Sequence, residues 1–546
     1  MIWFKERFEK IRQWRLPEIT GLLKGVENVT PYFYLLLGLS VVVLSANLGE
    51  PPLWGSEGRW AVIARSMLRT GDLLSPALGI EYYWDKPLLS YWQVLPFASI
   101  KGGVDEFVVR FPSVVWAVVM LLLTYDLAKR WYSGQTALAS VGILATTYGF
   151  IFWGRNAQVE MTNAAMILLC LWYFVKHRYD QRYPWVYGLG VMMGLGANMK
   201  GIVLYAVPIC CFVIFSVVKK EWSWIPPVKV LIKTGLISFA VFLAVPTVTC
   251  IHSATWEPLQ MVWRENVLRY FGLHDHQSPF YMYFIHIFSL GAPWAFLLPA
   301  ALIHSLQVAR RRDWQIQEAL ILFCAIFIFF TLSGARRSYY LLPILPFSAI
   351  LVGNMLGEFR ADALGRWIRG SIRGLGFLLG LAMIVPFVAS LMFRQVLPLD
   401  TGVLWIVSGA LALLGGAMIA SVTRRYFWGM VGSVFAIWFL YVIGLIPLIA
   451  EGPNLKTQVA KVRALDRPCG FLNMDDAKFI FYLDKPYQIF NDPTEALHWA
   501  IRTDGILVTS TRVPDQSWEC VVKGHRWQAF TPPENPPSLN DSRNFR

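Results

Sequence analysis

Long apolar runs separated by short polar connections fill most of the chain between residues 31 and 450. An uncharged apolar run of roughly 20 residues is typical of a helix that crosses a lipid bilayer. The pattern therefore predicts a polytopic α-helical membrane protein. About thirteen spanning helices are expected, near residues 31–48, 108–128, 135–154, 160–175, 183–199, 201–218, 230–251, 281–304, 316–333, 339–357, 371–392, 402–421 and 426–450.

Lys and Arg residues are concentrated in every second connection between these runs. If the basic N-terminus is cytoplasmic, every predicted inner loop is basic, as the positive-inside rule requires. One helix more or fewer would invert this pattern, so thirteen is the preferred number. The C-terminal segment is then extracytoplasmic. The basic residues of the inner loops are Lys129, Arg130, Lys176, Arg178, Arg182, Lys219, Lys220, Lys229, Lys233, Arg310, Arg311, Arg312, Arg360, Arg366, Arg369, Arg373, Arg424 and Arg425.

The composition supports the same class of protein. The chain of 546 residues is 56% hydrophobic and only 15% charged, whereas soluble domains carry about 25% charged residues. A net charge of +14 could indicate nucleic-acid binding, but the basic residues lie where membrane topology requires them. We therefore expect membrane lipids and no nucleic acid as partners, and a monomer.

The positions of the polar segments divide the chain into four parts. Residues 1–28 alternate basic and apolar side chains, which predicts a helix lying on the anionic cytoplasmic surface. Residues 29–451 form the membrane domain, with long outer loops at 49–107 and 252–280. The first outer loop contains two short amphipathic segments, which we expect to lie as helices on the outer leaflet.

The composition changes to that of a soluble domain at about residue 452. Residues 452–531 contain four short strand-like segments and two helical ones, which predicts a small extracytoplasmic α/β domain. Residues 532–546 are expected to be disordered. If this domain lies outside the cytoplasm, a disulfide between Cys469 and Cys520 is plausible.

Several charged residues lie on the outer side, where topology does not require them. Charges within or beside a span are costly and often functional, although any single one could snorkel or form a salt bridge at a helix end. Their location on one face, with further charges in the first loop, favours a site lined by Arg155 and Lys200 among others. These outer charges are Arg155, Glu160, Lys200, His276 and Arg337.

The residue types favour chemistry on a lipid phosphate. Lys and Arg, with no dedicated acidic partner evident in the sequence, suit phosphate oxygens. Glu57, Asp85 or Glu160 could act as a general base or orient an acceptor. A flippase or transporter of lipid-linked saccharides, or a non-catalytic membrane scaffold, are the alternatives from other classes.

The order of several motifs resembles a known family. They are EGRWAVIARSM, YYWDKPLLSYW, RNAQVEMTNAAMILL, GLGANMKGIVLYAVP, HQSPFYMYF and SGARRSYYLLPILP. Over nearly the whole chain this series resembles the bacterial aminoarabinose transferases of lipid A, which belong to the GT-C glycosyltransferases related to protein O-mannosyltransferases. The resemblance implies inverting transfer of a sugar from a polyprenyl phosphate, of the undecaprenyl-phosphate type, to a glycolipid, glycan or protein acceptor at the outer face.

The resemblance also assigns roles to individual residues. Arg59, Tyr83 and Lys86 match positions that hold the donor phosphate, and we add Arg337 as a fourth phosphate ligand. Asp85 and His276 match positions that can hold a divalent cation such as zinc or magnesium. The remaining matches are Glu160 as an acidic site residue, Tyr340 as a site-lining tyrosine and Lys200 in a turn where a structural role is equally compatible.

One departure from the family concerns the catalytic base. Where the family has an Asp-Glu pair in the first loop, with the Asp as the favoured base, this chain has Ser56 and Glu57. A serine cannot accept a proton at neutral pH as a carboxylate does. We therefore expect either that Glu57 or Glu160 serves as the base, or that the acceptor is already nucleophilic, as a phosphate is.

Overall fold

The computed structural model describes residues 29–533, apart from residues 181, 265–278, 312–316, 335, 359–363, 393–400, 451–453, 475, 511–517 and 525–526. The predicted surface helix at 1–28, the predicted tail beyond residue 533, and His276 lie outside the described residues.

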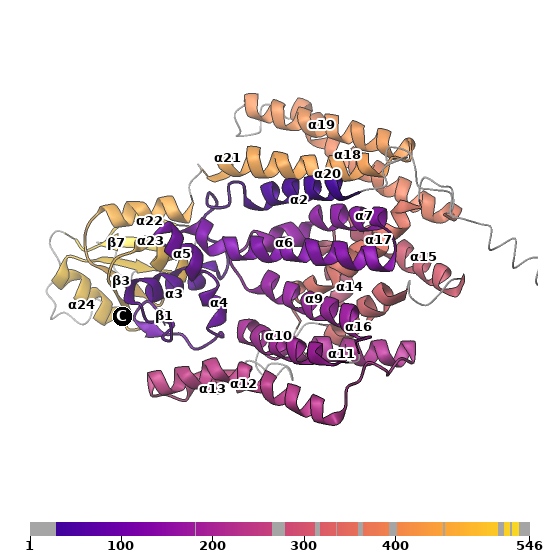
Figure 1. Ribbon diagram of the computed structural model, residues 1–546. Helices are drawn as coiled ribbons and strands as arrows, with labels where there is room; N and C mark the ends of the chain where they lie inside the picture. Colours follow the sequence, from indigo (N-terminus) through magenta and orange to yellow (C-terminus); the bar gives the residue numbers. More distant parts are fainter. Residues whose placement is uncertain are drawn as a thin grey trace, which may run out of the picture.

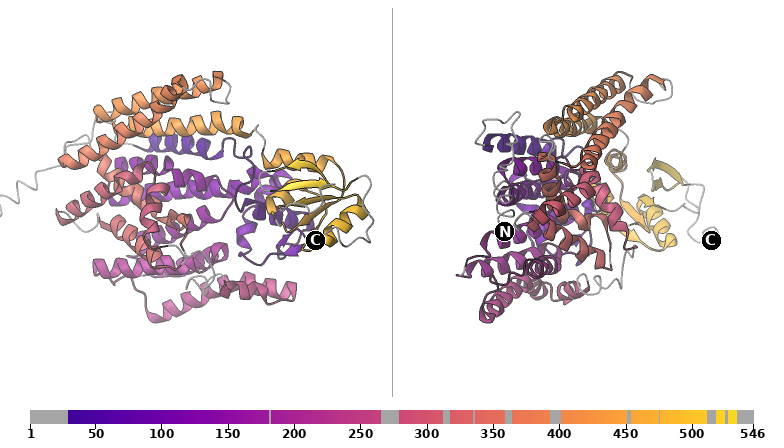
Figure 2. Two further views of the ribbon diagram at one scale, coloured as in Figure 1. Left: turned by 180° about the vertical axis from the view of Figure 1, so that it is seen from behind. Right: turned by 90° about the vertical axis from the view of Figure 1, so that its right-hand side faces the viewer.

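Most helices run side by side in one bundle, and the first outer loop and the C-terminal domain lie together at one end of it (Figure 1, Figure 2). The first-loop elements are α3 (Glu57–Thr70), β1 (Ala77–Leu78), β2 (Glu81–Tyr82), α4 (Leu89–Trp92) and α5 (Leu95–Lys101). The others before the C-terminal domain are α2 (Thr30–Ser45), α6 (Glu106–Trp131), α7 (Gly134–Ala145), α8 (Tyr148–Gly154), α9 (Glu160–His177), α10 (Pro184–Lys200), α11 (Val203–Lys219), α12 (Val228–Ser253), α13 (Glu257–Trp263), α14 (Met282–Leu290), η2 (Trp294–Leu297), α15 (Leu298–Arg311), α16 (Glu318–Leu332), η4 (Ser338–Ile344), α17 (Leu345–Gly357), α18 (Arg366–Met392), α19 (Thr401–Thr423), α20 (Phe427–Phe439), η5 (Leu440–Leu445) and α21 (Ile446–Ala450).

The predicted number of thirteen spans is not confirmed. Within the described residues, six helices are long and apolar enough to cross a membrane, or seven if α7 and α8 count as one bent span. These two helices meet at an angle of 64°, and the hydroxyls of Thr146 and Thr147 donate to the carbonyls of Gly142 and Ile143 at 2.7 Å and 2.8 Å. Apolar runs that the sequence presents as single spans are thus broken into shorter pieces.

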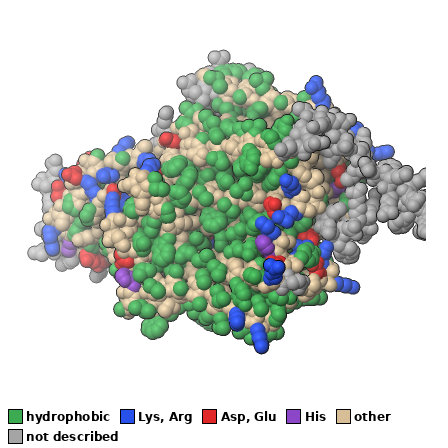
Figure 3. All heavy atoms as spheres, in the orientation of Figure 1, with side chains coloured by type: hydrophobic (Ala, Val, Ile, Leu, Met, Phe, Trp, Pro, Cys, Tyr) green, Lys and Arg blue, Asp and Glu red, His purple; other side chains and the backbone are tan. Residues whose placement is uncertain are grey.

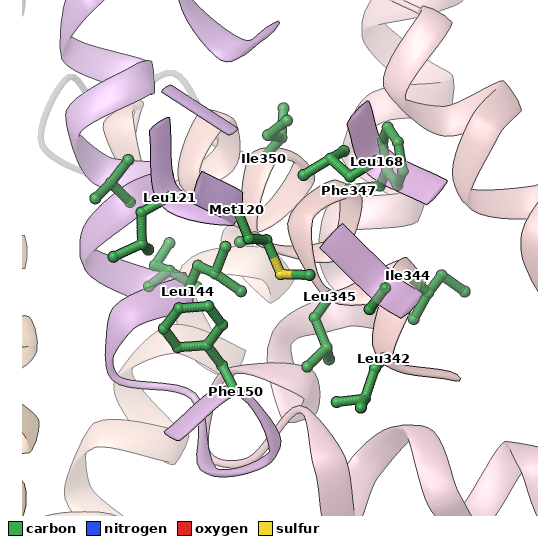
Figure 4. Close-up of a cluster of buried hydrophobic side chains, with 14 of the residues drawn as sticks. Met120, Leu121, Leu144, Phe150, Leu168, Leu342, Ile344, Leu345, Phe347 and Ile350 are labelled. Atoms are coloured by element: carbon green, nitrogen blue, oxygen red, sulfur yellow. The ribbon is translucent and has the colours of Figure 1, made fainter. Parts of the chain in front are cut away.

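The bundle is apolar both inside and on its flank. Met120, Leu144, Phe150 and Phe347, from α6, α7, α8 and α17, pack into one buried cluster (Figure 4). On the face shown in Figure 3, apolar side chains cover the middle of the molecule and charged ones gather towards its two ends. Such a surface suits a bilayer around the bundle with both ends in water.

The C-terminal domain is a mixed α/β fold, as the sequence predicts for this segment. Its five-stranded sheet has the order β4-β3-β5-β7-β6. Strands β4, β3 and β5 are parallel to one another, and β7 pairs antiparallel with both β5 and β6. The sequence pattern did not indicate β7 and α22. The elements are α22 (Leu455–Ala464), β3 (Cys469–Leu472), α23 (Ala477–Leu483), β4 (Tyr487–Phe490), α24 (Pro493–Thr503), β5 (Ile506–Thr509), β6 (Glu519–Lys523) and β7 (Gln528–Thr531).

The first loop packs against this domain, so the expectation of α3 lying on the outer leaflet is wrong. Trp60 and Ile63 of α3 share one buried cluster with Phe471 and Phe479 of the C-terminal domain. Contact at the start of α3 is close, because a Cβ atom added at Gly58 would lie 2.5 Å from the backbone nitrogen of Lys478. The apolar face of α3 is therefore buried by protein.

The disulfide between Cys469 and Cys520, which the sequence left open, is not formed in the structure, where both cysteines are free thiols. Cys469 lies on β3 and Cys520 on β6, with β5 and β7 between them. Three strand spacings of about 4.8 Å separate the two residues by about 14 Å, whereas a disulfide needs Cα atoms within about 7 Å.

This arrangement predicts the reactivity of the two thiols. Cys520 is exposed and Cys469 is buried, so a maleimide should label Cys520 of the folded full-length protein without any reductant and should reach Cys469 only after denaturation. Peptide mass spectrometry of the labelled protein would measure this. A Cys469–Cys520 cross-linked peptide in the unreduced digest would contradict the observed sheet order.

Candidate functional site

The first loop and the ends of several helices enclose a cavity of about 440 Å³, which we call the charged cavity. Seven of the residues expected at the site line it: Arg59, Asp85, Lys86, Glu160, Lys200, Arg337 and Tyr340. They come from segments far apart in the sequence, namely α3, the connection after β2, the start of α9, the end of α10 and η4. Ser56, at the position of the family's Asp, also lines it, as do residues that were not assigned to the site from the sequence: Trp60, Gln158, Asn163, Met261, Ser333 and Tyr339.

A chain of hydrogen bonds connects the predicted phosphate-binding residues of the first loop. The Arg59 guanidinium donates to the Tyr83 hydroxyl at 2.8 Å, and that hydroxyl donates to the Asp85 carboxylate at 2.8 Å. The Lys86 ammonium donates to the Asp85 carbonyl oxygen at 2.9 Å and lies 3.3 Å from its carboxylate. Tyr83 thus links Arg59 to Asp85 without lining the cavity itself, whereas Arg59 and Lys86 do line it.

These contacts fix the charge state of Asp85. Burial alone would raise its pKa, but the charge of Lys86, the hydrogen bonds from Tyr83 and Lys86, and the charge of Arg264 hold the pKa of Asp85 below its ordinary value. Asp85 is therefore a carboxylate at neutral pH, and its low pKa makes it a weak proton acceptor. Its position suits orientation of the neighbouring cations better than general-base catalysis.

Glu160 and Lys200 form an ion pair in the wall of the cavity. Gly201, with a φ of 106°, ends α10 directly after Lys200, a conformation that L side chains rarely adopt. The Lys200 ammonium lies 5.2 Å and 5.1 Å from the ring centres of Tyr339 and Tyr340. Lys86 and Lys200 thus each have an acidic neighbour; Asp85 is adjacent to Lys86 in the sequence, whereas the pairing of Lys200 with Glu160 was not evident from it.

The start of the second outer loop reaches the same cavity. Met261 of α13 lines it, and the Arg264 guanidinium lies 3.3 Å from the Asp85 carboxylate and 3.4 Å from the Trp84 carbonyl oxygen. Neither residue was expected at the site. Arg264 lies in a loop with several other charged residues, and nothing in the sequence distinguished it from them as a site residue.

Glu57 departs from its expected position, because it does not line the charged cavity. Its side chain is 1% exposed and forms a buried ion pair with Arg110 of α6 at 2.7 Å. It also accepts hydrogen bonds from the backbone nitrogens of Trp54 and Ala157, both at 2.7 Å. These bonds occupy both oxygens, and this position argues against Glu57 as the base. Arg110 could have been found as a lone charge inside an apolar span.

Two further expected residues lie elsewhere. Arg155 does not line the charged cavity but a second one, described below. His276 lies outside the described residues, so the divalent-cation site with Asp85 stays a prediction. Within the part of the chain that the structure describes, no group of three or more His, Cys, Asp and Glu side chains could hold a metal ion. The oxygens of Asp85 already accept from Tyr83, Lys86 and Arg264.

The charged cavity combines an excess of positive charge with an apolar side. Four cationic side chains line it, from Arg59, Lys86, Lys200 and Arg337, against the two carboxylates of Asp85 and Glu160. Val203, Ala206, Phe329 and Phe330, from α11 and α16, form an apolar part of the lining. Cations beside an apolar wall match an anionic headgroup on a hydrophobic chain.

Comparison with known sequences supports this interpretation. The family described as dolichyl-phosphate-mannose-protein mannosyltransferase matches residues 85–246. An undecaprenyl phosphate-alpha-4-amino-4-deoxy-L-arabinose arabinosyl transferase of Pseudomonas aeruginosa is 28% identical over 448 residues, which are 77% of this chain and 75% of the relative. A transferase of the same name from Pseudomonas fluorescens is 28% identical over 65% of each chain.

Solved structures share the fold. The crystal structure of ArnT from Cupriavidus metallidurans bound to undecaprenyl phosphate matches with a TM-score of 0.71 and 19% identity, over 94% of this chain and 99% of that one. The same protein in the apo state matches with a TM-score of 0.66 and 18% identity. Together, these comparisons confirm the resemblance indicated by the motifs: the chain shares the fold of ArnT, is similar over about three quarters of its length to aminoarabinose transferases, and matches the protein mannosyltransferase family over residues 85–246.

Proposed function

We propose that the protein is a membrane glycosyltransferase that moves a sugar from a polyprenyl-phosphate carrier to an acceptor at the outer face of the bacterial inner membrane. The observation that carries this proposal is the charged cavity, where four cations and an apolar wall surround one space. The curated relatives, whose names give an undecaprenyl-phosphate-linked aminosugar, support the class of donor.

The cations supply what departure of a lipid phosphate requires. In an inverting transfer, the acceptor oxygen attacks the anomeric carbon while the bond from that carbon to the phosphate oxygen breaks. The phosphate then carries one more negative charge than before. Arg59, Lys86 and Arg337 line the cavity, where preorganised cations stabilise charge that develops in the transition state.

We propose further that the acceptor is a phosphate group on a glycolipid. Ser56 lines the cavity at the position of the family's Asp, while Asp85 has a lowered pKa and Glu160 is paired with Lys200. A phosphate monoester has its second pKa near 6 and attacks as a dianion, so it needs no base. Charge balances, because a monoanionic donor and a dianionic acceptor give a monoanionic phosphodiester and dianionic polyprenyl phosphate.

The orientation proposed from the sequence fits the positions of the charged groups. The protein is a multi-pass membrane protein related to bacterial inner-membrane transferases. The charged cavity adjoins the first loop, and the basic residues Lys129, Lys176 and Lys219 lie towards the opposite helix ends. This supports a cytoplasmic N-terminus and an extracytoplasmic site and C-terminal domain.

The test offers matched acceptors to the purified full-length protein in liposomes. Undecaprenyl-phosphoryl aminoarabinose is the first donor to try. We expect sugar transfer, with release of free undecaprenyl phosphate, to a phosphorylated glycolipid, and at least 100-fold slower transfer to the same glycolipid after removal of its phosphates. Equal rates with both acceptors would refute the phosphate acceptor but not the donor. Absence of transfer from polyprenyl-phosphoryl sugars to all acceptor classes would refute the proposed function.

A further inference from the structure

A second cavity of about 640 Å³ lies next to the charged cavity and shares no lining residue with it. We call it the aromatic cavity. Residues 54–57 and 155–160 lie between the two, because Ser56 and Gln158 line the charged cavity while Trp54 and Asn156 line the aromatic one. The aromatic cavity is therefore separate from the charged cavity, and the proposed sugar transfer assigns no role to the aromatic cavity.

The aromatic cavity has a cation without an acidic partner among the described residues. The Arg155 guanidinium donates to the backbone oxygens of Val43 at 2.7 Å and Leu44 at 3.0 Å, with Asn47 at 3.5 Å. Burial and the nearby charge of Arg110 lower the pKa of Arg155 to about 10, so Arg155 stays charged at neutral pH. A half-buried charge with only neutral partners favours an anion beside it.

A second polar group at the cavity wall also lacks a partner within the described part of the chain. Asn156 is 4% exposed, and its side-chain oxygen is buried without a hydrogen bond. Such atoms are rare in proteins, where more than about 90% of buried polar groups are paired. Arg155 and Asn156 are adjacent, so one headgroup that carries both an anion and a hydroxyl could satisfy both.

Most of the remaining lining is apolar, and its other charged residues, Glu57 and Arg110, are paired with each other. Tyr148, Phe152 and Trp438 form a row of stacked rings, with centres 5.7 Å and 6.4 Å apart. Leu411 of α19 and the π-helix η5 complete this side, and π-helical segments occur often at functional sites. The neighbouring α19 residues Ile406 and Leu413 are exposed at 72% and 79%, as expected beside lipid chains.

We infer that the aromatic cavity is a second lipid site, which holds the phosphate headgroup of a lipid on Arg155 and Asn156 while its chains lie against α19 and η5. A lipid fits better than free phosphate because most of the lining is apolar. The lipid would brace the joint between the α7–α8 bend and the last helices. This inference does not depend on the proposed transfer.

The test measures binding of phosphatidic acid to the full-length protein in micelles by native mass spectrometry. It uses Lys86→Ala as the background, so that a cation of the charged cavity is already absent. We expect Arg155→Gln to weaken binding at least tenfold. Leu411→Trp is designed to fill the aromatic cavity while leaving Arg155 in place, and it should also weaken binding at least tenfold. Its thermal midpoint should equal that of the background protein, which would show that the loss of binding is not caused by misfolding.

Three outcomes would overturn the inference. They are equal binding of phosphatidic acid and phosphate-free diacylglycerol, unaltered binding in Leu411→Trp, and displacement of the lipid by inorganic phosphate at a similar concentration. Binding that depends on both Arg155 and Leu411 and resists inorganic phosphate supports it. Transfer activity is not part of the readout, so failure of the proposed function would leave this result interpretable.

Discussion

Replacing Lys86 with alanine should slow sugar transfer about 100-fold to 1,000-fold, the usual cost of losing one preorganised group that stabilises developing charge. The Lys86 ammonium lines the charged cavity next to Arg59 and is only 22% exposed. It would therefore act on the leaving phosphate with little screening by water. Initial rates of polyprenyl phosphate release, at saturating acceptor, measure the effect.

A matched control separates this role from a general effect of removing a first-loop lysine. Lys101 lies in the same loop and pairs with Asp105, as Lys86 pairs with Asp85, but its side chain is 49% exposed and it does not line the charged cavity. Lys101→Ala should keep the rate within about twofold of the unaltered protein, since exposed ion pairs contribute little. Equal losses in both variants would contradict the assignment of Lys86 to the donor phosphate.

Much of the charged cavity could be predicted because membrane topology restricts where charges occur. Lys200 and Arg337 are in different spans, yet the positive-inside pattern placed both at the outer helix ends, and the structure brings both to one cavity. The first-loop residues Arg59, Asp85 and Lys86 joined them through ordered motifs. In a helix bundle, residues at the same end of neighbouring helices lie near one another. The distribution of charges along the sequence was therefore sufficient to predict that these residues are close together.

The direction of a side chain at a loop or helix start could not be predicted. Ser56 and Glu57 are neighbours, but Ser56 lines the charged cavity while Glu57 turns inward to Arg110, which is 53 positions away. Arg155 was grouped with Lys200 because both are outer cations, and yet the two line different cavities. In each case the helix end could be predicted from the sequence, but the direction of the side chain could not.

Long-range packing was equally inaccessible. The amphipathic pattern of α3 correctly indicated a helix with one apolar face, but a membrane surface and a protein surface impose the same pattern. Only the structure shows that Phe471 and Phe479 of the C-terminal domain cover this face. The ion pair between Arg65 and Asp484, at 3.0 Å, adds to the same contact.

The buried pair of Glu57 and Arg110 should have the largest effect on stability. Arg110 donates to both oxygens of Glu57 and also to the carbonyl oxygens of Leu48, Pro51 and Pro52, at 2.8 to 2.9 Å. The pair thus connects α6, the segment before α3 and the turn before α9. Glu57→Ala would leave the guanidinium buried without its counter-charge, so the free energy of unfolding should fall by about 3–5 kcal/mol.

Denaturant titration of the protein in mixed micelles, followed by tryptophan fluorescence, would measure this loss. The control is Arg467→Ala, which removes an exposed ion pair with Asp504 at 3.0 Å and should cost at most about 1 kcal/mol. Glu57→Gln keeps the shape of the side chain and one acceptor oxygen, so its loss of unfolding free energy should lie between those of Glu57→Ala and Arg467→Ala. If Glu57→Ala instead unfolded like the unaltered protein but lost transfer, Glu57 would belong to the reaction, and the structural role argued from its four hydrogen bonds would be wrong.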